Sequence, residues 1–208
     1  MIIAIDGPTA SGKGTIAKAL AAHYGLPHLD TGLLYRAVGR QCMLAGGNPD
    51  DPEHALSATD FPGSLLEDPA LRSEETGALA SRVSIHPGVR AALLARQQAF
   101  ARQPGGAVLD GRDIATVIAP EAEAKLFVTA SVAARALRRW SEMQQRGESV
   151  SRDEIEADLA ARDERDRTRA AAPLRQAAGA ALLDTSALPI DAAIAAAIAL
   201  VEQQVAAR

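Results

Sequence analysis

Short apolar runs along the chain alternate with longer segments in which apolar residues recur every three or four positions. The runs cover residues 2–6, 26–29, 107–110, 125–129 and 181–184, and none shows the strict alternation of a half-exposed strand. Such runs are typical of strands that are buried on both faces. The segments between them predict helices over residues 13–24, 33–45, 88–101 and 131–146, and a last helix with the apolar stripe Ile190, Ile194, Ile198, Val201 and Val205.

This order of elements predicts an α/β fold in which helices flank a central parallel sheet, giving three layers. Two regions interrupt the alternation. Residues 46–104 are rich in proline and glycine at first and then helical without an evident strand, which indicates an insert over about residues 31–105. Residues 147–169 begin with a capping box formed by Ser151 and Glu154. We expect a single domain over residues 1–208 that carries this insert and a lid over about residues 146–169.

Composition narrows the classes of function. The 208 residues are 48% hydrophobic, which is enough for a substantial core, and the formal net charge of -4 disfavours nucleic acid or membrane partners. The longest apolar run, residues 192–201, is shorter than the roughly 18 to 20 residues that span a bilayer. The N-terminus lacks the basic stretch of a secretory signal, and the single cysteine, Cys42, fits a reducing compartment. We therefore expect a cytoplasmic protein.

The first apolar run leads directly into a glycine-rich loop with the pattern G-x-x-x-x-G-K, followed by the first predicted helix. Backbone N–H groups of such a turn, together with the positive end of the helix, suit the phosphates of a nucleotide, and Lys13 adds a cation for the outer phosphates. Gly14 stands where a hydroxyl residue is usual, with Thr15 one position later. A plain strand-to-helix turn is the alternative interpretation. The loop comprises Gly7, Pro8, Thr9, Ala10, Ser11, Gly12, Lys13, Gly14 and Thr15.

The predicted lid helix carries three arginines and an aspartate at helical spacing. Arg162, Arg165, Asp166 and Arg169 are expected to share one face. A solvated face with ion pairs would explain this pattern as well. Beside a phosphate loop, however, positioned arginines are the usual means of stabilising the charge of a transferring phosphoryl group.

Two further polar segments follow predicted strands. Asp110 in the turn Asp110-Gly111-Arg112-Asp113 could hold magnesium through water, although a simple Asp-Gly turn is the alternative. The segment from Asp30 to Arg36 opens a helix and brings an arginine near the same edge of the sheet, although an ordinary N-cap by Asp30 or Thr31 with a surface arginine is the alternative. Histidines at metal-ligand spacing are absent, and we interpret His23, His28, His54 and His86 as structural. We expect no metal site made of protein side chains.

Together these motifs resemble those of the nucleoside monophosphate kinases, and within them the bacterial cytidylate kinases. The resemblance rests on Gly12-Lys13-Gly14-Thr15, on Leu29-Asp30-Thr31-Gly32 leading to Tyr35-Arg36, on residues 110–117, and on residues 165–169 followed by Ala172-Pro173-Leu174. It spans about residues 1–186. The resemblance implies transfer of the γ-phosphoryl group of ATP to CMP or dCMP, with Mg2+, in pyrimidine nucleotide metabolism.

The resemblance also implies roles for individual residues. Residues 7–15 would bind ATP, and the catalytic side chains would be Lys13, Arg112, Arg162 and Arg165. CMP would be bound by Thr31, Arg36, Ser81, Arg90, Arg112, Asp113, Arg162, Asp166 and Arg169. A carboxylate at Asp113 can accept a hydrogen bond from the N4 amino group of cytosine but would repel O4 of uracil. Because Gly14 has no side chain, magnesium would be held mainly by water and phosphate.

Other functions remain open from the residues alone. Another P-loop kinase, acting on a nucleoside or a metabolite hydroxyl, would share the loop. A nucleotide-dependent switch would share it too, but a GTP switch needs an Asn-Lys-x-Asp run that this chain lacks. We expect small-molecule substrates, no nucleic acid or membrane partner, and a monomer.

Overall fold

The computed structural model describes residues 1–145, 147 and 149–207. The chain divides into two compact units, which are described separately below. The first unit comprises residues 1–29 and 101–208, and the second comprises residues 30–100. Arg146, the last residue of one predicted helix and the first of the predicted lid, lies outside the described residues.

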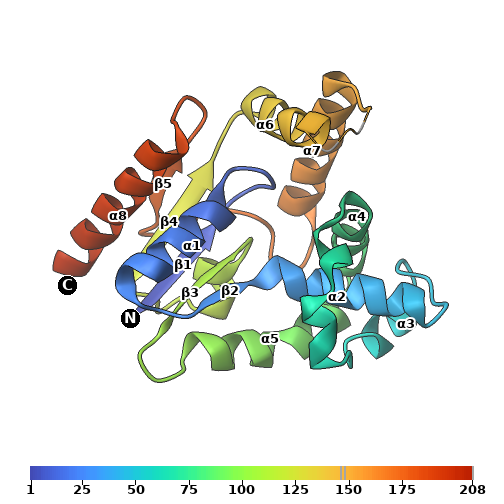
Figure 1. Ribbon diagram of the computed structural model, residues 1–208. Coiled ribbons are helices and arrows are strands. Elements are labelled where there is room, and N and C mark those ends of the chain that lie inside the picture. The colour runs from blue at the N-terminus through green and yellow to red at the C-terminus, as the bar shows by residue number, and fades with distance from the viewer. Residues whose placement is uncertain (146, 148, 208) are drawn as a thin grey trace. The chain divides into compact units, whose positions relative to one another are not determined.

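The first unit is built on a five-stranded sheet with the order β2-β3-β1-β4-β5 (Figure 1). Its strands are β1 (Ile2–Asp6), β2 (His28–Asp30), β3 (Ala107–Gly111), β4 (Ala124–Thr129) and β5 (Ala181–Asp184). β1 lies at the centre and runs parallel to β3 and β4, with Asp6 opposite Gly111 and Phe127. The prediction of an α/β fold with a parallel central sheet is confirmed.

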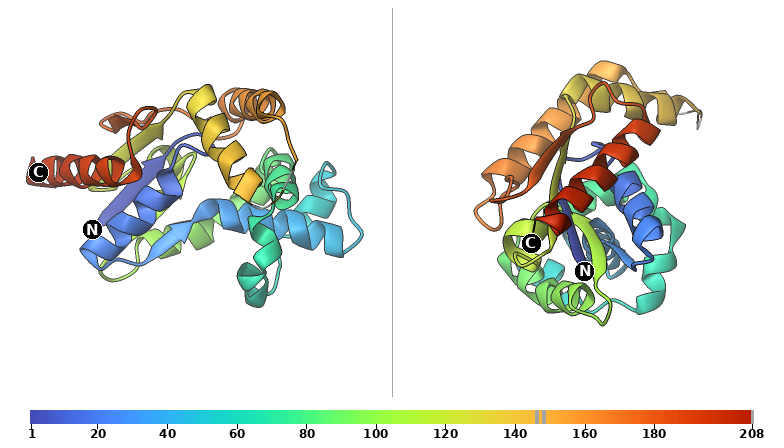
Figure 2. Two further views of the ribbon diagram at one scale, coloured as in Figure 1. Left: turned by 45° about the horizontal axis from the view of Figure 1, so that its top comes forward. Right: turned by 90° about the vertical axis from the view of Figure 1, so that its left-hand side faces the viewer.

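The helices of this unit are α1 (Lys13–Tyr24), the π-helical turn η3 (Ile114–Ile118), α6 (Val132–Gln145), α7 (Arg152–Thr168) and α8 (Ile190–Ala206). α1 and α8 pack together against the sheet, as both views in Figure 2 show. None of the described helices is long and apolar enough to cross a membrane. The core that positions the phosphate loop is formed by Ile3, Ile5, Ile16, Leu20, Val108, Leu126, Val128, Ala193, Ala197 and Val201.

Two details of the predicted elements are wrong. The second strand was expected at residues 26–29, but the N–H of Leu26 donates to the carbonyl of Ala21 and ends α1, so the strand begins later, at His28. The predicted stripe of α8 also fails at both ends, because Ile190 and Val205 are 46% and 42% exposed. The helix instead buries three residues on one face, two of them alanines whose small side chains allow close packing: Ala193, Ala197 and Val201.

The second unit is helical, and none of its residues, all of which are described, forms a strand after β2 ends. Its elements are α2 (Thr31–Leu44), α3 (Pro52–Ser57), the 3-10 turns η1 (Gly63–Glu67) and η2 (Pro69–Arg72), α4 (Glu74–Val83) and α5 (Pro87–Ala101). α2 and α4 approach closely at Gly39, where an added Cβ would lie 2.6 Å from the Cβ of Leu79. The side chain of Asp30 caps α2 by accepting the N–H of Gly32.

Candidate active site

The glycine-rich loop connects β1 to α1 in the first unit. Gly7 has no room for a side chain, since an added Cβ would lie 2.0 Å from the carbonyl oxygen of Val128. Gly12 precedes the helix with a left-handed φ of 85°, and its carbonyl accepts the N–H groups of Thr15 and Ile16. The first turn of α1 contains no acidic residue. The loop therefore presents a helix N-terminus suited to an anion.

Lys13 and Asp110 lie close together beside this loop. The Nζ atom of Lys13 is 3.9 Å from Oδ2 of Asp110, while Oδ1 of the same carboxylate is 2.7 Å from Nε2 of His28. An added Cβ at Gly14 would be 3.9 Å from Oδ2 of Asp110, so position 14 faces the carboxylate. Among the described residues, no three His, Cys, Asp or Glu side chains gather as a metal site. A single carboxylate beside an open glycine fits a metal ion that keeps most of its water.

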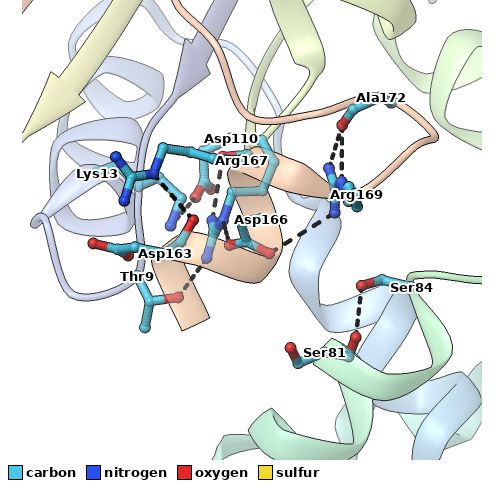
Figure 3. A network of polar contacts seen from close by, with 12 residues as sticks. Thr9, Lys13, Ser81, Ser84, Asp110, Asp163, Asp166, Arg167, Arg169 and Ala172 are labelled. Atoms are coloured by element: carbon cyan, nitrogen blue, oxygen red, sulfur yellow. Dashed lines mark hydrogen bonds and ion pairs between the residues drawn. The ribbon is translucent and has the colours of Figure 1, made fainter. Parts of the chain in front are cut away.

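Asp166 of α7 is a buried carboxylate surrounded by arginines (Figure 3). Nε of Arg112 donates to Oδ2 of Asp166 at 2.7 Å, and Nη1 of Arg169 is 3.9 Å from Oδ1. Burial alone would raise the pKa of Asp166, but the charges of Arg112, Arg162 and Arg169 hold it below its ordinary value. The carboxylate is therefore ionised at neutral pH, and it gathers cations in one place.

Arg112, and not Arg165, supplies the third guanidinium at Asp166. Helical spacing assigned Arg165 as the third guanidinium at Asp166, whereas the structure supplies Arg112 from the turn after β3. Arg165 is exposed.

Two arginines connect the loop to α7, one at Asp166 and one at Asp163. Nη2 of Arg112 donates to the hydroxyl of Thr9. Arg135 of α6, only 2% exposed, donates to the carbonyl of Thr9 and forms a two-pronged ion pair with Asp163 of α7. Apolar packing supports this arrangement, because Ala10 of the loop lies against the cluster formed by Ala136, Met143, Ile155 and Leu159. α7 and the loop thus form one connected structure.

Asp113, the residue that sequence reasoning placed against the base, is 5% exposed and follows Arg112 in the same turn. The first unit therefore holds together the loop, Lys13, Asp110, Arg112, Asp113 and the residues of α7. Such a set can bind a polyphosphate, place cations around a transferring group and offer a carboxylate to an amino group of a substrate.

The other predicted contacts belong to the second unit. Nη1 of Arg36 donates to the carbonyls of Leu71 and Ser73, both at 2.8 Å. The guanidinium of Arg90 lies over the ring of Tyr35 at 5.4 Å, an arrangement that favours a cation over an aromatic face. Thr31 and Ser81 are buried in the same unit, and the carbonyl of Ser81 accepts the hydroxyl of Ser84 (Figure 3).

Comparison with known proteins decides the family. The family model described as cytidylate kinase matches residues 3–203. The chain belongs to the cytidylate kinase family. It is 59% identical over 208 residues to a protein named cytidylate kinase from Xanthobacter autotrophicus, covering 100% of both chains. It is 56% identical to a cytidylate kinase from Caulobacter, covering 97% of this chain and 94% of that one.

A solved structure shows the same fold as this member of the cytidylate kinase family. It is an uncharacterized protein from Eubacterium ventriosum, with a TM-score of 0.57, 14% sequence identity, and coverage of 97% of this chain and 98% of that one. The family membership confirms the resemblance that the motifs predicted, and it extends through both units.

Sequence reasoning missed three residues of this site. His28 was interpreted as structural, yet it contacts Asp110. Arg135 and Asp6 received no role, although Arg135 binds the phosphate loop and Asp6 binds the turn that carries Asp113. Asp6 carried a signal, because it is a charged residue at the end of an otherwise apolar strand, whereas Arg135 lies within a helix of mixed composition and His28 in a short strand.

Proposed function

We propose that this protein is an ATP-dependent kinase that transfers the γ-phosphoryl group of ATP to CMP or dCMP, releasing ADP and CDP or dCDP, in pyrimidine nucleotide metabolism. Membership of the cytidylate kinase family supports this proposal. The observation that carries it is the ionised carboxylate of Asp166, which holds three arginines next to a phosphate loop and is linked to Thr9 through Arg112.

We assign the donor and transfer roles as follows. Residues 7–15 bind the ATP phosphates, and Lys13 neutralises the outer ones. An oxygen of the CMP phosphate attacks the γ-phosphorus while its bond to the bridging oxygen breaks, and ADP keeps that oxygen. Arg112, Arg162 and Arg165 stabilise the negative charge that spreads over the transferring group. Arg112 and Arg162 already lie at Asp166, whereas Arg165 is exposed and would have to reach the group when substrate is bound.

Magnesium is the proposed companion of ATP, and Asp110 is the residue that would hold it, through water. When bound, the ion neutralises phosphate charge and aligns the phosphoryl group. Position 14 contributes no ligand, but its missing side chain leaves the face of Asp110 open.

Recognition of CMP is assigned to Asp113 for the base, together with Asp166 and Arg169 of the first unit. A buried carboxylate accepts a hydrogen bond from the N4 amino group of cytosine, while uracil would present an oxygen to it. Thr31, Arg36, Ser81 and Arg90 of the second unit are proposed as CMP contacts on the strength of the family resemblance. We further propose a monomer that works in the cytoplasm, in line with a single buried cysteine.

A coupled assay of ADP release tests the function. With ATP and Mg2+, we expect rapid release with CMP and dCMP, and release slower by about 10²-fold or more with UMP, because a buried carboxylate would face the uracil oxygen. AMP and cytidine are included as acceptors with the wrong base and without the phosphate. Preference for UMP or AMP would refute the assignment of cytosine, and preference for cytidine over CMP would indicate a kinase of another class.

A further inference from the structure

Asp6 is a buried carboxylate that the mechanism above does not use. It ends β1, directly before the phosphate loop, and is 1% exposed. Its Oδ1 accepts the N–H of Ile114 at 2.8 Å, and its Oδ2 accepts the N–H of Ala115 at 2.9 Å. Both oxygens are thus occupied by backbone groups more than a hundred positions away in sequence.

These two N–H groups open the short helical turn η3. The first N–H groups of any helical turn lack partners within it, and a side chain usually satisfies them from the preceding residue. Here that residue is Asp113, whose side chain does not cap the turn. Asp6 caps it instead, so the carboxylate that we assign to the base is not the one that holds the turn together.

The contact also fixes the backbone on both sides of the proposed recognition residues. Gly111 lies opposite Asp6 in the parallel ladder of β1 and β3. Ile114, three residues later, is held by the side chain of the same Asp6. Arg112 and Asp113 therefore lie between two points that are both attached to one residue of the central strand.

We propose that Asp6 is a positioning residue for acceptor selection, which holds Arg112 and Asp113 in the orientation that recognises CMP. This inference rests on the proposed function. The phosphate loop contacts Arg112 through the hydroxyl of Thr9, but it is also anchored without the Asp6 side chain, by the sheet pairing of β1, by Gly12 and by Arg135. Loss of the Asp6 carboxylate should therefore affect the acceptor far more than the donor.

The variant Asp6→Asn tests this with little change in volume. An asparagine has one acceptor oxygen and one NH2 group, so one of the two backbone N–H groups would face a donor. Glu123→Gln is the matched control, because Oε2 of Glu123 accepts the N–H of Ile2 at 2.6 Å at the other end of the same strand. The measurements are kcat and KM for CMP and ATP, and kcat/KM for UMP, on both variants and on the unaltered protein.

For Asp6→Asn we expect the KM for CMP to rise about tenfold and the ratio of kcat/KM for CMP over UMP to fall about tenfold, as for the loss of one buried hydrogen bond. The KM for ATP should change less than about twofold, and Glu123→Gln should leave all three values within about twofold. Equal increases in the KM of both substrates, or an unchanged CMP to UMP ratio, would overturn the proposal.

Amide hydrogen exchange on the unaltered protein decides the question if Asp6→Asn does not fold. The N–H groups of Ile114 and Ala115 should be protected, and CMP should slow their exchange further, whereas a non-hydrolysable ATP analogue alone should not. Exchange at the rate of an unstructured chain, or no response to CMP, would overturn the role of Asp6. Failure of the unaltered protein to phosphorylate CMP would instead refute the proposed function, so the two failures are distinguishable.

Discussion

Ionisation of Asp6 should destabilise the folded protein as the pH rises toward neutrality. Burial raises the pKa of this carboxyl from 3.8 to about 7, and the charge of Asp113 acts in the same direction. The N–H groups of Ala115 and Ile114 and the charge of Arg112 oppose the increase without cancelling it. Replacing Asp6 by asparagine removes the titration and keeps the size of the side chain.

The sign and the magnitude follow from proton linkage. Between pH 3.8 and about 7 the folded state binds a proton at Asp6 that the unfolded state has lost, so the free energy of unfolding decreases as pH rises. A difference of about three between the two pKa values corresponds to about 4 kcal/mol. The full favourable contribution is present below pH 3.8 and has been lost above about pH 7. The asparagine variant should show no such loss.

Urea unfolding followed by circular dichroism measures this difference at a series of pH values from about 4.5 to about 8.5. The quantity compared is the free energy of unfolding of the unaltered protein minus that of Asp6→Asn. This difference should decrease by several kcal/mol as the pH rises across the series. Glu154→Gln is the control, because the backbone N–H and hydroxyl of Ser151 lower the pKa of Glu154, so its contribution is lost only as the pH falls below 4.5. A difference that stays constant, or that increases with pH, would refute the reasoning.

Three further changes have defined outcomes. Lys13→Ala should reduce turnover by about 10²-fold or more with the fold intact, while Lys18→Ala, exposed on the same helix, should keep full ADP release; an active Lys13→Ala would contradict the role of the loop. Gly39→Ala places a Cβ 2.6 Å from that of Leu79, so urea unfolding should show a loss of about 1–3 kcal/mol, and unchanged stability would contradict the close approach of α2 and α4. Ser151→Ala removes the cap of α7 and should cost about 1 kcal/mol, visible as faster amide exchange in the first turn of α7; equal exchange would contradict the capping box.

Local signals predicted the elements that position the loop. Residues 13–24 were expected as a helix and form α1 with the same bounds, because Gly12 and Gly25 flank it in left-handed conformations with φ of 85° and 64°. The capping box of Ser151 and Glu154 is also confirmed. It was predictable because its two partners are only three residues apart.

Contacts between distant segments were not predictable in this way. Helical spacing predicted that Arg165 would lie at Asp166. The third guanidinium there is Arg112, which precedes Asp166 by 54 positions in the sequence. Spacing also gave α8 a stripe of large residues, of which Ile194, Ile198 and Val201 do pack against the core. The buried Ala193 and Ala197 were missed, because their small side chains carry little signal in a hydrophobic pattern. The assignments of Arg36, Ser81 and Arg90 to CMP stay predictions.

The central place of β1 in the sheet affects how the protein can be made. Both neighbours of this strand are synthesised late, since β3 begins at Ala107 and β4 at Ala124. Synthesis proceeds at about 5–20 residues per second, so roughly 5–20 s pass between synthesis of β1 with its loop and synthesis of the strands that pair with β1. The unit of residues 30–100 is complete in sequence before then. The loop that we propose to bind ATP is therefore synthesised well before β3 and β4, and it cannot take its final structure until both of those strands have followed it.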